Sequence, residues 1–206
     1  MRTLAIDSAT ETCSVALFED EQLIAGDCRT LGRGHAEALV PMIAALPGQG
    51  RADRIVVALG PGSFTGLRVG LAAARALALA WGAQLQGYPT LALIAAMARA
   101  AQGTQDVTVC MTGGHGEWFV ARYDAAGLEQ APLASLRPEQ AAALPLAPLV
   151  AGSQAEALVA RSGAGTALPL WPDARQVMLL PPAAFSASVQ LLYGRPPDAR
   201  LPGQTA

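Results

Sequence analysis

The residues best suited to chemistry lie in a glycine-rich segment, residues 60–70, which reads Gly-Pro-Gly-Ser-Phe-Thr-Gly-Leu-Arg-Val-Gly. It follows an apolar stretch and precedes a predicted helix. Backbone N–H groups at the start of a helix can bind an anion, and glycine lets a ligand come close to them. The same pattern also suits a tight turn in which Ser63 or Thr65 caps the helix, and on pattern alone this turn is the favoured interpretation.

Two known phosphate-binding motifs do not fit this segment. A P-loop needs a lysine, and the sequence contains none. A dinucleotide-binding turn needs G-x-G-x-x-G, whereas Gly60, Gly62 and Gly66 give a spacing that is one residue too long. The absence of lysine also excludes Schiff-base chemistry and a lysine general base.

A second candidate is the polar turn Asp7–Thr12, which follows the first predicted strand. An acid and three hydroxyl groups in such a turn could orient a phosphate or a hydrated Mg²⁺. The same residue types also bond neighbouring backbone groups in ordinary turns, which is the commoner outcome. The two segments together supply the candidate nucleotide or anion contacts, which are Asp7, Ser8, Thr10, Gly60, Gly62, Ser63 and Thr65.

No metal site or catalytic residue is predicted. His35 and His115 are far apart in the chain and have no neighbouring histidine or cysteine at ligand spacing, so a zinc site is not expected. A two-metal nuclease could be assembled from Asp7, Glu37 and Asp53. Three scattered acids among 16 are a weak signal for such an enzyme.

Length, net charge and cysteine spacing limit the classes of protein to which the chain could belong. A chain of 206 residues suits one large domain or two small lobes. Its formal net charge is −2, and no stretch clusters positive charge as proteins that bind nucleic acid unaided do. Cys13, Cys28 and Cys110 lack CxxC spacing and are expected to be reduced thiols.

No targeting or membrane segment is predicted. Asp7 stands where a signal peptide would carry its apolar stretch. The longest weakly polar run, Ala76–Ala98, is interrupted by glutamines, Gly87 and Pro89, so it does not predict a membrane span. We therefore expect a cytoplasmic protein.

Hydrophobic periodicity predicts alternating strands and helices along residues 1–102. The predicted strands are Thr3–Ile6, Cys13–Phe18, Gln22–Cys28, Ile55–Leu59 and Gln84–Tyr88. The predicted helices are His35–Leu46, Gly66–Trp81 and Leu91–Ala101. The polar segment Gln102–Asp106 then indicates a boundary between two lobes.

A similar order of elements recurs after this boundary. The predicted strands are Val107–Met111, Glu117–Tyr123, Leu128–Leu133, Leu149–Ala151 and Val177–Leu180, and the predicted helices are Pro138–Leu144, Gln154–Arg161 and Ala183–Tyr193. The sequence thus predicts an α/β fold of two lobes, each a mixed β-sheet flanked by helices. The N-terminal lobe spans residues 1–102, a smaller C-terminal lobe spans 103–193, and 194–206 form a loose or docked tail.

The predicted helix Gly66–Trp81 has a smooth side. Gly66, Gly70, Ala74 and Ala78 recur every four residues, and small residues at this spacing let another helix approach closely. Leucines cover much of the remaining surface. A helix that is apolar on nearly all sides is buried in its own core or against another subunit, and both interpretations stay open.

Three blocks of residues resemble the TsaB (YeaZ) family. The first is residues 5–17, with Ala-Ile-Asp-Ser-Ala-Thr and then Cys-Ser-Val-Ala-Leu; the second is His-Ala-Glu-Ala-Leu-Val-Pro at 35–41. The third is the glycine-rich segment 60–70, whose Gly-Pro-Gly-Ser-Phe-Thr-Gly-x-Arg pattern is highly specific. The resemblance covers about the first 100 residues.

The resemblance implies an actin-like (ASKHA, ribonuclease-H-like) fold of two lobes, in agreement with the recurring element order. It also implies a non-catalytic subunit in the bacterial synthesis of N6-threonylcarbamoyladenosine at adenosine 37 of tRNAs that read codons beginning with A. Such a subunit pairs with TsaD, which carries the metal and the transfer chemistry, and cooperates with the ATPase TsaE. It meets tRNA only through the complex.

In this family the interface is built from the first two helices of the N-terminal lobe. The resemblance therefore implies partner contacts at Leu39, Ile43, Leu46, Gly66, Gly70, Ala73, Ala74 and Leu77. The same helices could form a homodimer. No tightly bound cofactor is expected, and ATP or ADP would lie at the interface of the complex.

The sequence also departs from the family's patterns. It lacks the H-x-x-x-H metal motif of TsaD-like members, so it is not expected to be an enzyme. Where members often carry Asp-Ala-Arg-x-x-Glu-Val-Tyr, residues Thr112–Phe119 lack that acid and arginine, and the usual Tyr-Leu-Arg near the end is reduced to Ala199–Leu201. The alternative function is an actin-like ATPase or phosphotransferase that uses Asp7 and the loop Gly60–Gly66, and the missing acid weakens that expectation.

Overall fold

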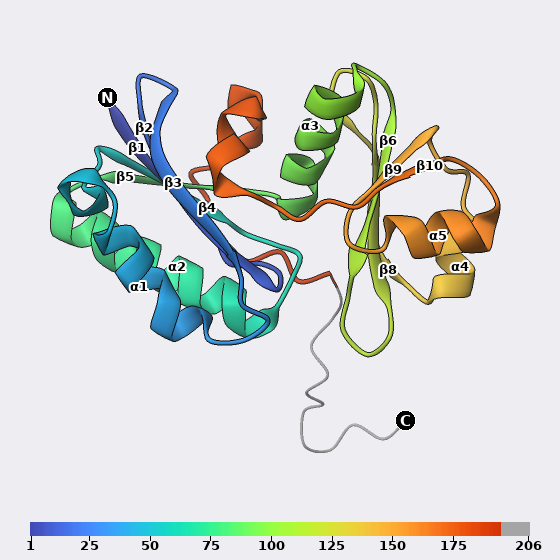
Figure 1. Cartoon of the computed structure of the whole chain (residues 1–206), viewed down its shortest axis with the longest axis horizontal. Helices are drawn as coiled ribbons and strands as arrows, with labels where there is room; N and C mark the ends of the chain where they lie inside the picture. Colours follow the sequence, from blue (N-terminus) through green and yellow to red (C-terminus); the bar gives the residue numbers. More distant parts are fainter. Residues whose placement is uncertain (195–206) are drawn as a thin grey trace.

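The computed structural model describes residues 1–194 and has two lobes, each built on a five-stranded sheet (Figure 1). The strands of the first lobe are β1 (Arg2–Asp7), β2 (Thr12–Glu19), β3 (Gln22–Thr30), β4 (Arg54–Ala58) and β5 (Gln84–Tyr88). Its helical segments are α1 (His35–Ala44), the 3₁₀ turn η1 (Pro47–Gly50), α2 (Phe64–Trp81) and α3 (Thr90–Gln102). The predicted elements of this lobe are all present, with small shifts at their ends.

The second lobe repeats the topology of the first. Its strands are β6 (Val107–Thr112), β7 (Trp118–Tyr123), β8 (Glu129–Leu136), β9 (Leu149–Ala151) and β10 (Thr166–Leu168), with the helices α4 (Pro138–Ala142) and α5 (Ala155–Ser162). The sheets have the orders β3-β2-β1-β4-β5 and β8-β7-β6-β9-β10. In each, three strands form an antiparallel meander and two more add in parallel to the first. The predicted fold of two lobes, each a mixed sheet flanked by helices, is confirmed.

Helices cover both outer faces of the molecule (Figure 1). On the first lobe, α1 and α2 pack on one face of the sheet, against alternate strand residues such as Leu4, Ile6, Ile55 and Val57. On the second lobe, α4 and α5 cover the corresponding face over Val120 and other buried residues. Successive side chains of a strand point to opposite faces of the sheet. The apolar side chains on the other face of each sheet must therefore also be covered by another element.

Helix α3 supplies that second cover to both sheets, between which it lies (Figure 1). Leu93 and Met97 belong to the core of the first lobe, whereas Leu91, Ile94 and Ala98 belong to the core of the second. A helix that is apolar on all sides is stable only when it is covered on all sides. Helix α3 therefore holds the two lobes together.

The chain after β10 differs from the prediction. The predicted strand Val177–Leu180 is wrong, because these residues lie in and after a 3₁₀ helix, η2 (Ala174–Leu179). The predicted helix Ala183–Tyr193 is also wrong, since only the short 3₁₀ turn η3 (Pro182–Ala184) forms there. Two consecutive prolines, Pro181 and Pro182, remove the backbone donors that a strand or a longer helix would need.

Residues 170–193, which the prediction assigns to the second lobe, return to the first. Ala174, Val177 and Leu180 are buried in its core, and Ser186 pairs with Gly87 beside β5. The Leu192 backbone N–H donates to the Leu59 carbonyl at 2.8 Å. Of the predicted tail 194–206, only Gly194 belongs to the described residues.

The small residues of α2 face their own sheet. A side chain at Gly66 would collide with the Ser8 carbonyl oxygen, and one at Gly70 would collide with the Ser8 hydroxyl. Ala74 is fully buried on the same side. Among the described residues, α2 is the one helix long and apolar enough to span a membrane by length and composition. Its packing on the first sheet uses one side of the helix only.

The close contact between α2 and β1 yields a stability prediction. Gly66→Val should lower the free energy of unfolding by about 3 kcal/mol, because the added atoms meet backbone at Ser8 that cannot move aside. Urea denaturation of the purified protein measures the change. Ala72→Val adds the same side chain at an exposed position of α2 and should cost less than about 1 kcal/mol. Equal losses in the two variants would contradict this packing.

Candidate functional site

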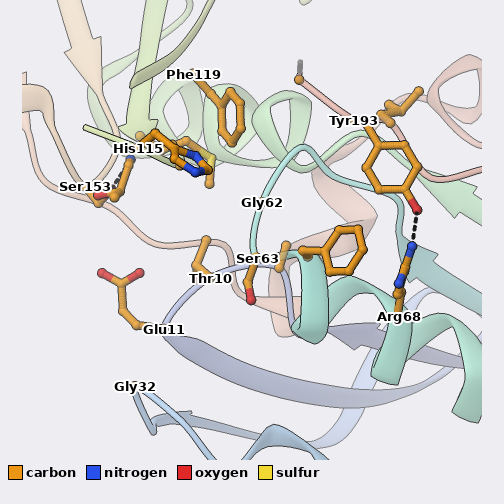
Figure 2. Close-up of a pocket in the computed structure, with 18 residues that line it drawn as sticks. Thr10, Glu11, Gly32, Gly62, Ser63, Arg68, His115, Phe119, Ser153 and Tyr193 are labelled. Carbon is orange, nitrogen blue, oxygen red and sulfur yellow. Dashed lines mark hydrogen bonds between the residues drawn. The ribbon is translucent and has the colours of Figure 1, made fainter. Parts of the chain in front are cut away.

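A cleft of about 890 Å³ lies between the two lobes (Figure 2). Its first wall comes from the turn after β1 and the start of α2, and its second wall from the β6–β7 turn and the loop after β9. The lining residues of the first wall are Ala9, Thr10, Glu11, Gly32, Gly62, Ser63, Phe64 and Arg68. Those of the second wall are Met111, Thr112, Gly113, Gly114, His115, Phe119 and Ser153, and the returning segment adds Leu192, Tyr193 and Gly194.

The carboxylate of Asp7 is buried and does not line this cleft. It accepts hydrogen bonds from the Ala9 backbone N–H at 3.0 Å and from the Tyr88 hydroxyl at 3.0 Å. Removal from water raises the pKa of Asp7 to about 6, and the charge of Asp173 adds to the effect. The acid that could have oriented a phosphate or a hydrated cation instead ties the end of β1 to β5.

The other candidate anion contacts divide into two groups. Ser8 is buried and donates its hydroxyl to the Gly66 carbonyl at 2.9 Å, and Gly60 is buried with a φ of 100°. Thr65 is exposed on α2 and is not part of the lining. Thr10, Gly62 and Ser63 do line the cleft.

Ser63 has the capping role that the turn interpretation predicts. Its hydroxyl oxygen accepts a hydrogen bond from the Gly66 backbone N–H at 3.2 Å, at the N-terminus of α2. This bond satisfies one of the N–H groups that a helix start leaves without a partner. The predicted cap is confirmed.

The candidate contacts named from the sequence all lie in the first lobe and include no residue of the second wall. Figure 2 shows His115, Ser153 and Phe119 on one side of the cleft and Thr10, Ser63 and Arg68 on the other. The signal that could have found this wall is the repeated element order. The turn after β6 corresponds to the turn after β1, so a duplicated fold brings the two turns to one cleft. Residues 112–119, where the sequence departs from the family pattern, contribute to this wall.

His35 has a structural role at the first wall. It is buried at the start of α1, and its Nε2 lies 2.8 Å from the Thr10 carbonyl oxygen and 3.3 Å from that of Thr12. The imidazole therefore fixes the turn after β1 to the first helix. Of the two histidines, the one at the cleft is His115.

No metal centre forms in the described part of the chain, where no three histidine, cysteine or acidic side chains could share an ion. The three acids weighed for a nuclease are not together. Asp7 lies at the end of β1, Glu37 is exposed on α1, and Asp53 accepts the Arg2 backbone N–H at the opposite end of the sheet. All three cysteines are free thiols, and burial raises the pKa of Cys13 to about 11 and that of Cys110 to about 12.

The residues expected at a partner interface are mostly inside the first lobe. Leu39, Ile43, Leu46, Gly66, Gly70 and Ala74 are buried, whereas Ala73 and Leu77 are partly exposed. The same apolar or small side that suits a partner packs here on the sheet beneath, although Ile43 also lines the groove between α1 and α2. Bulk at Gly70 or Ala74 would disturb the lobe itself.

An apolar surface that includes two of the expected contacts, Ala73 and Leu77, remains exposed on the same two helices. We call it the α1/α2 outer face, and its members are Val40, Ala44, Ala72, Ala73, Ala76, Leu77, Leu79 and Ala80. Val40 is 58% exposed and Leu79 is 88% exposed. A shallow groove of about 350 Å³ runs between the helices beside Val40, Ala44, Leu77 and Trp81. The first lobe thus leaves an apolar strip uncovered.

The burial of Asp7 predicts how stability depends on pH. Its pKa in the folded protein lies above the value of 3.8 for an ordinary aspartate, so the folded state holds the proton more tightly. The free energy of unfolding should therefore fall as the pH rises from about 4 to 6, by about 3 kcal/mol for a shift of this size. Asp7→Asn should remove this slope and be the more stable protein at pH 7.5.

Chemical denaturation between pH 4 and 8 measures this difference. Glu37→Gln, which changes an exposed acid, should leave the slope in place. If Asp7→Asn has a lower free energy of unfolding than the wild type at pH 7.5, the claim that the buried Asp7 charge opposes folding is contradicted. ATP turnover by the wild type that Asp7→Asn abolishes would instead favour the phosphotransferase alternative.

Comparison with known proteins gives consistent matches. A family model described as TsaD, tRNA N6-adenosine threonylcarbamoyltransferase, matches residues 29–169. The chain is 37% identical to the tRNA threonylcarbamoyladenosine biosynthesis protein TsaB of Escherichia coli (strain K12) over 128 residues, which are 60% of this chain and 55% of that protein. For TsaB of Bacillus subtilis (strain 168) the identity is 32% over 104 residues, 48% and 45% of the two chains. The chain thus spans about half the length of the curated relatives it matches.

Solved structures share the whole fold. A Pseudomonas aeruginosa protein described as similar to peptidase YEAZ has a TM-score of 0.79 and 27% identity, over 94% of this chain and 99% of that one. YeaZ from Pseudomonas aeruginosa has a TM-score of 0.73 and 28% identity, over 87% and 89%. EutJ from Carboxydothermus hydrogenoformans, at 14% identity and a TM-score of 0.51, shares the fold alone. The fold is therefore actin-like, and the chain belongs to the TsaB (YeaZ) family, within the wider family that the TsaD model describes.

Proposed function

We propose that the chain acts in the biosynthesis of N6-threonylcarbamoyladenosine in tRNA, as a non-catalytic subunit that pairs with TsaD. The names of its TsaB relatives support the pathway. The observation that carries the pairing is the α1/α2 outer face, where Val40 and Leu79 are exposed among alanines. Contiguous apolar side chains on a protein surface favour a site for a partner.

The composition of this face suits helix packing. Ala72, Ala76 and Ala80 recur every four residues along α2, so a partner helix could approach closely. The larger side chains of Val40 and Leu79 project beyond these alanines and would fill pockets in the partner. In the proposed pair, the face takes over the role that the sequence first suggested for the Gly66–Ala74 side.

The donor groups of the chain support a non-catalytic role. The buried carboxylate of Asp7 has both oxygens in hydrogen bonds within the lobe. The described residues bring no set of metal ligands together, and the cleft has one carboxylate, that of Glu11, among its lining residues. Transfer chemistry would therefore reside in TsaD.

The wider assembly follows from the same role. TsaE would join the pair, and ATP or ADP would lie at the boundary of the complex, with no cofactor bound tightly by this chain alone. Because its arginines are scattered, tRNA would be met only through the complex. Without TsaD, two copies could pair through the α1/α2 outer face. A role in tRNA modification supports the proposed cytoplasmic location.

A charge placed on the outer face should break the pairing. Co-expression with TsaD from the same bacterium should yield a one-to-one complex, which size-exclusion chromatography with light scattering measures. Leu79→Asp should weaken it at least about tenfold, because an apolar contact would have to bury a carboxylate. Monomer stability should hardly change, since Leu79 is so exposed.

The matched control is Leu128→Asp, which introduces the same charge at an exposed leucine of the second lobe. It should leave the complex intact. Absence of a complex at micromolar concentration, or equal pairing by Leu79→Asp and the wild type, would refute the proposed interface.

A further inference from the structure

The two sheets have four edge strands, which are β3, β5, β8 and β10 (Figure 1). Three of them are protected from pairing with another chain. Strand β5 pairs at Gly87 with Ser186 of the returning segment, β10 is only three residues long, and β8 contains Pro132 and two register shifts. Short length, proline and irregular register are common ways to keep an edge strand from adding a further strand. Within residues 1–194, β3 is the one long edge strand without such protection.

Strand β3 has an open and regular edge. It is nine residues long, from Gln22 to Thr30, and none of these residues is buried. Its one irregularity, opposite Leu17 and Phe18 of β2, lies toward the hairpin end of the strand. Residues 25–30 pair regularly with β2, so their outer edge presents an unbroken row of backbone donors and acceptors.

The hydrogen-bonding pattern fixes which backbone groups point outward. The Leu31 backbone N–H donates to the Glu11 carbonyl at 2.8 Å, so the odd-numbered residues of this part of the chain bond to β2. In an antiparallel ladder, successive residues bond alternately to one side and to the other. The N–H and C=O groups of Gly26, Cys28 and Thr30 therefore point away from the sheet.

The charges of β3 select a second copy of the chain in one register. Asp27 and Arg29 lie opposite Val15 and Cys13 of β2, on the face that α1 covers. If two β3 strands pair antiparallel about Cys28, Asp27 of each copy lies opposite Arg29 of the other. Pairing about Asp27 or about Arg29 would instead place like charges opposite each other, which is destabilising.

The backbone groups fit the same register. Pairing about Cys28 places Cys28 of one copy opposite Cys28 of the other, and Gly26 opposite Thr30. These are the residues whose N–H and C=O groups point outward, so each such pair can exchange both of its hydrogen bonds. The backbone pattern and the charge pattern thus agree on one centre.

The side chains between these bonds complete the contact. Asp27 and Arg29 would form the non-hydrogen-bonded pairs, in which opposite side chains are closest. Their side chains are 37% and 54% exposed, and Arg29 Nη2 lies 2.6 Å from Asp27 Oδ2 in the single chain. The second copy would extend this ion pair into a square of alternating charges. On either side of it, the apolar Ala25 would meet Leu31.

The strand direction keeps the second lobes of the two copies apart. Gly32, just after β3, lines the interlobe cleft, so the second lobe lies toward the C-terminal end of this strand. Antiparallel pairing reverses β3 in the second copy. The two second lobes would therefore lie at opposite ends of the joined sheet.

We propose that two copies of this chain pair through their β3 strands, which joins their first sheets into one continuous sheet centred on Cys28. The contact uses no residue of the α1/α2 outer face. It therefore does not depend on pairing with TsaD, and it differs from pairing of two copies through that face.

Sedimentation equilibrium of the full chain without TsaD, from micromolar to millimolar concentration, tests the contact. The wild type should form a dimer. Asp27→Arg and Arg29→Asp should each weaken it at least about tenfold, because each places like charges opposite each other at two positions. An equimolar mixture of the two variants should recover the dimer, since one copy then brings only arginines and the other only aspartates. Thermal unfolding shows that each variant is folded.

The matched control is Glu129→Arg, which reverses an exposed acid on β8, the edge strand of the other sheet. It should leave the dimer intact, as should Leu79→Asp. A wild type that stays monomeric at millimolar concentration would overturn the proposal, as would a mixture of the charge variants that does not pair. A dimer that Leu79→Asp abolishes and both charge variants retain would assign self-pairing to the α1/α2 outer face and refute the β3 contact.

Cys28 reports the register directly. Two residues in a hydrogen-bonded antiparallel pair have Cα atoms about 5.5 Å apart. A short bismaleimide, which adds one thiol at each of its two maleimides, should therefore link two copies, and Cys28→Ser should abolish the link because Cys13 and Cys110 are fully buried. Asp27→Arg should slow the linking. Linking that continues unchanged in Cys28→Ser, or no linking where the dimer is populated, would refute the register.

Discussion

The architecture depends on one helix that must be covered on every side. Helix α3 places Leu93 and Met97 in the core of the first lobe and Leu91, Ile94 and Ala98 in the core of the second. Because none of these side chains can be left in water without a loss of burial free energy, the two sheets are held at a fixed separation. The cleft between the lobes follows from this constraint, since the turns at the ends of β1 and β6 face each other across it.

The polar side chains at one end of the first sheet are buried and form hydrogen bonds within the lobe. The Asp7 carboxylate bonds to Tyr88 and Ala9, the Ser8 hydroxyl to the Gly66 carbonyl, and His35 to the carbonyl of Thr10. Each of these groups could do chemistry if it faced solvent. Here each joins one element of the lobe to another, at the cost of burying an acid whose pKa rises to about 6. The chemical groups of this end now support the cleft wall and do not enter it.

Helix α2 explains both a successful and a failed part of the sequence-based prediction. Its length, its Ser63 cap and its apolar character were predictable from residue spacing and type, as were the duplicated order of strands and helices and the two lobes. The orientation of its small residues was not. Gly66 and Gly70 suit close approach by any neighbour, and only the folded chain shows that the neighbour is Ser8 of its own β1. The exposed strip lies on the other side, at Leu79 and the alanines.

The sequence by itself determined the local elements, the family and the absence of lysine chemistry, because periodicity, capping and motif spacing are properties of neighbours along the chain. Tertiary structure decided which residues meet across the chain. It sent residues 170–193 back to the first lobe, since Val177 and Leu180 found an apolar core there and the prolines beside them could not continue a sheet. It also assembled the cleft from Phe64, Phe119 and Tyr193, whose separation along the sequence carries no signal of their proximity. Burial and long-range packing select these contacts, and no local pattern encodes them.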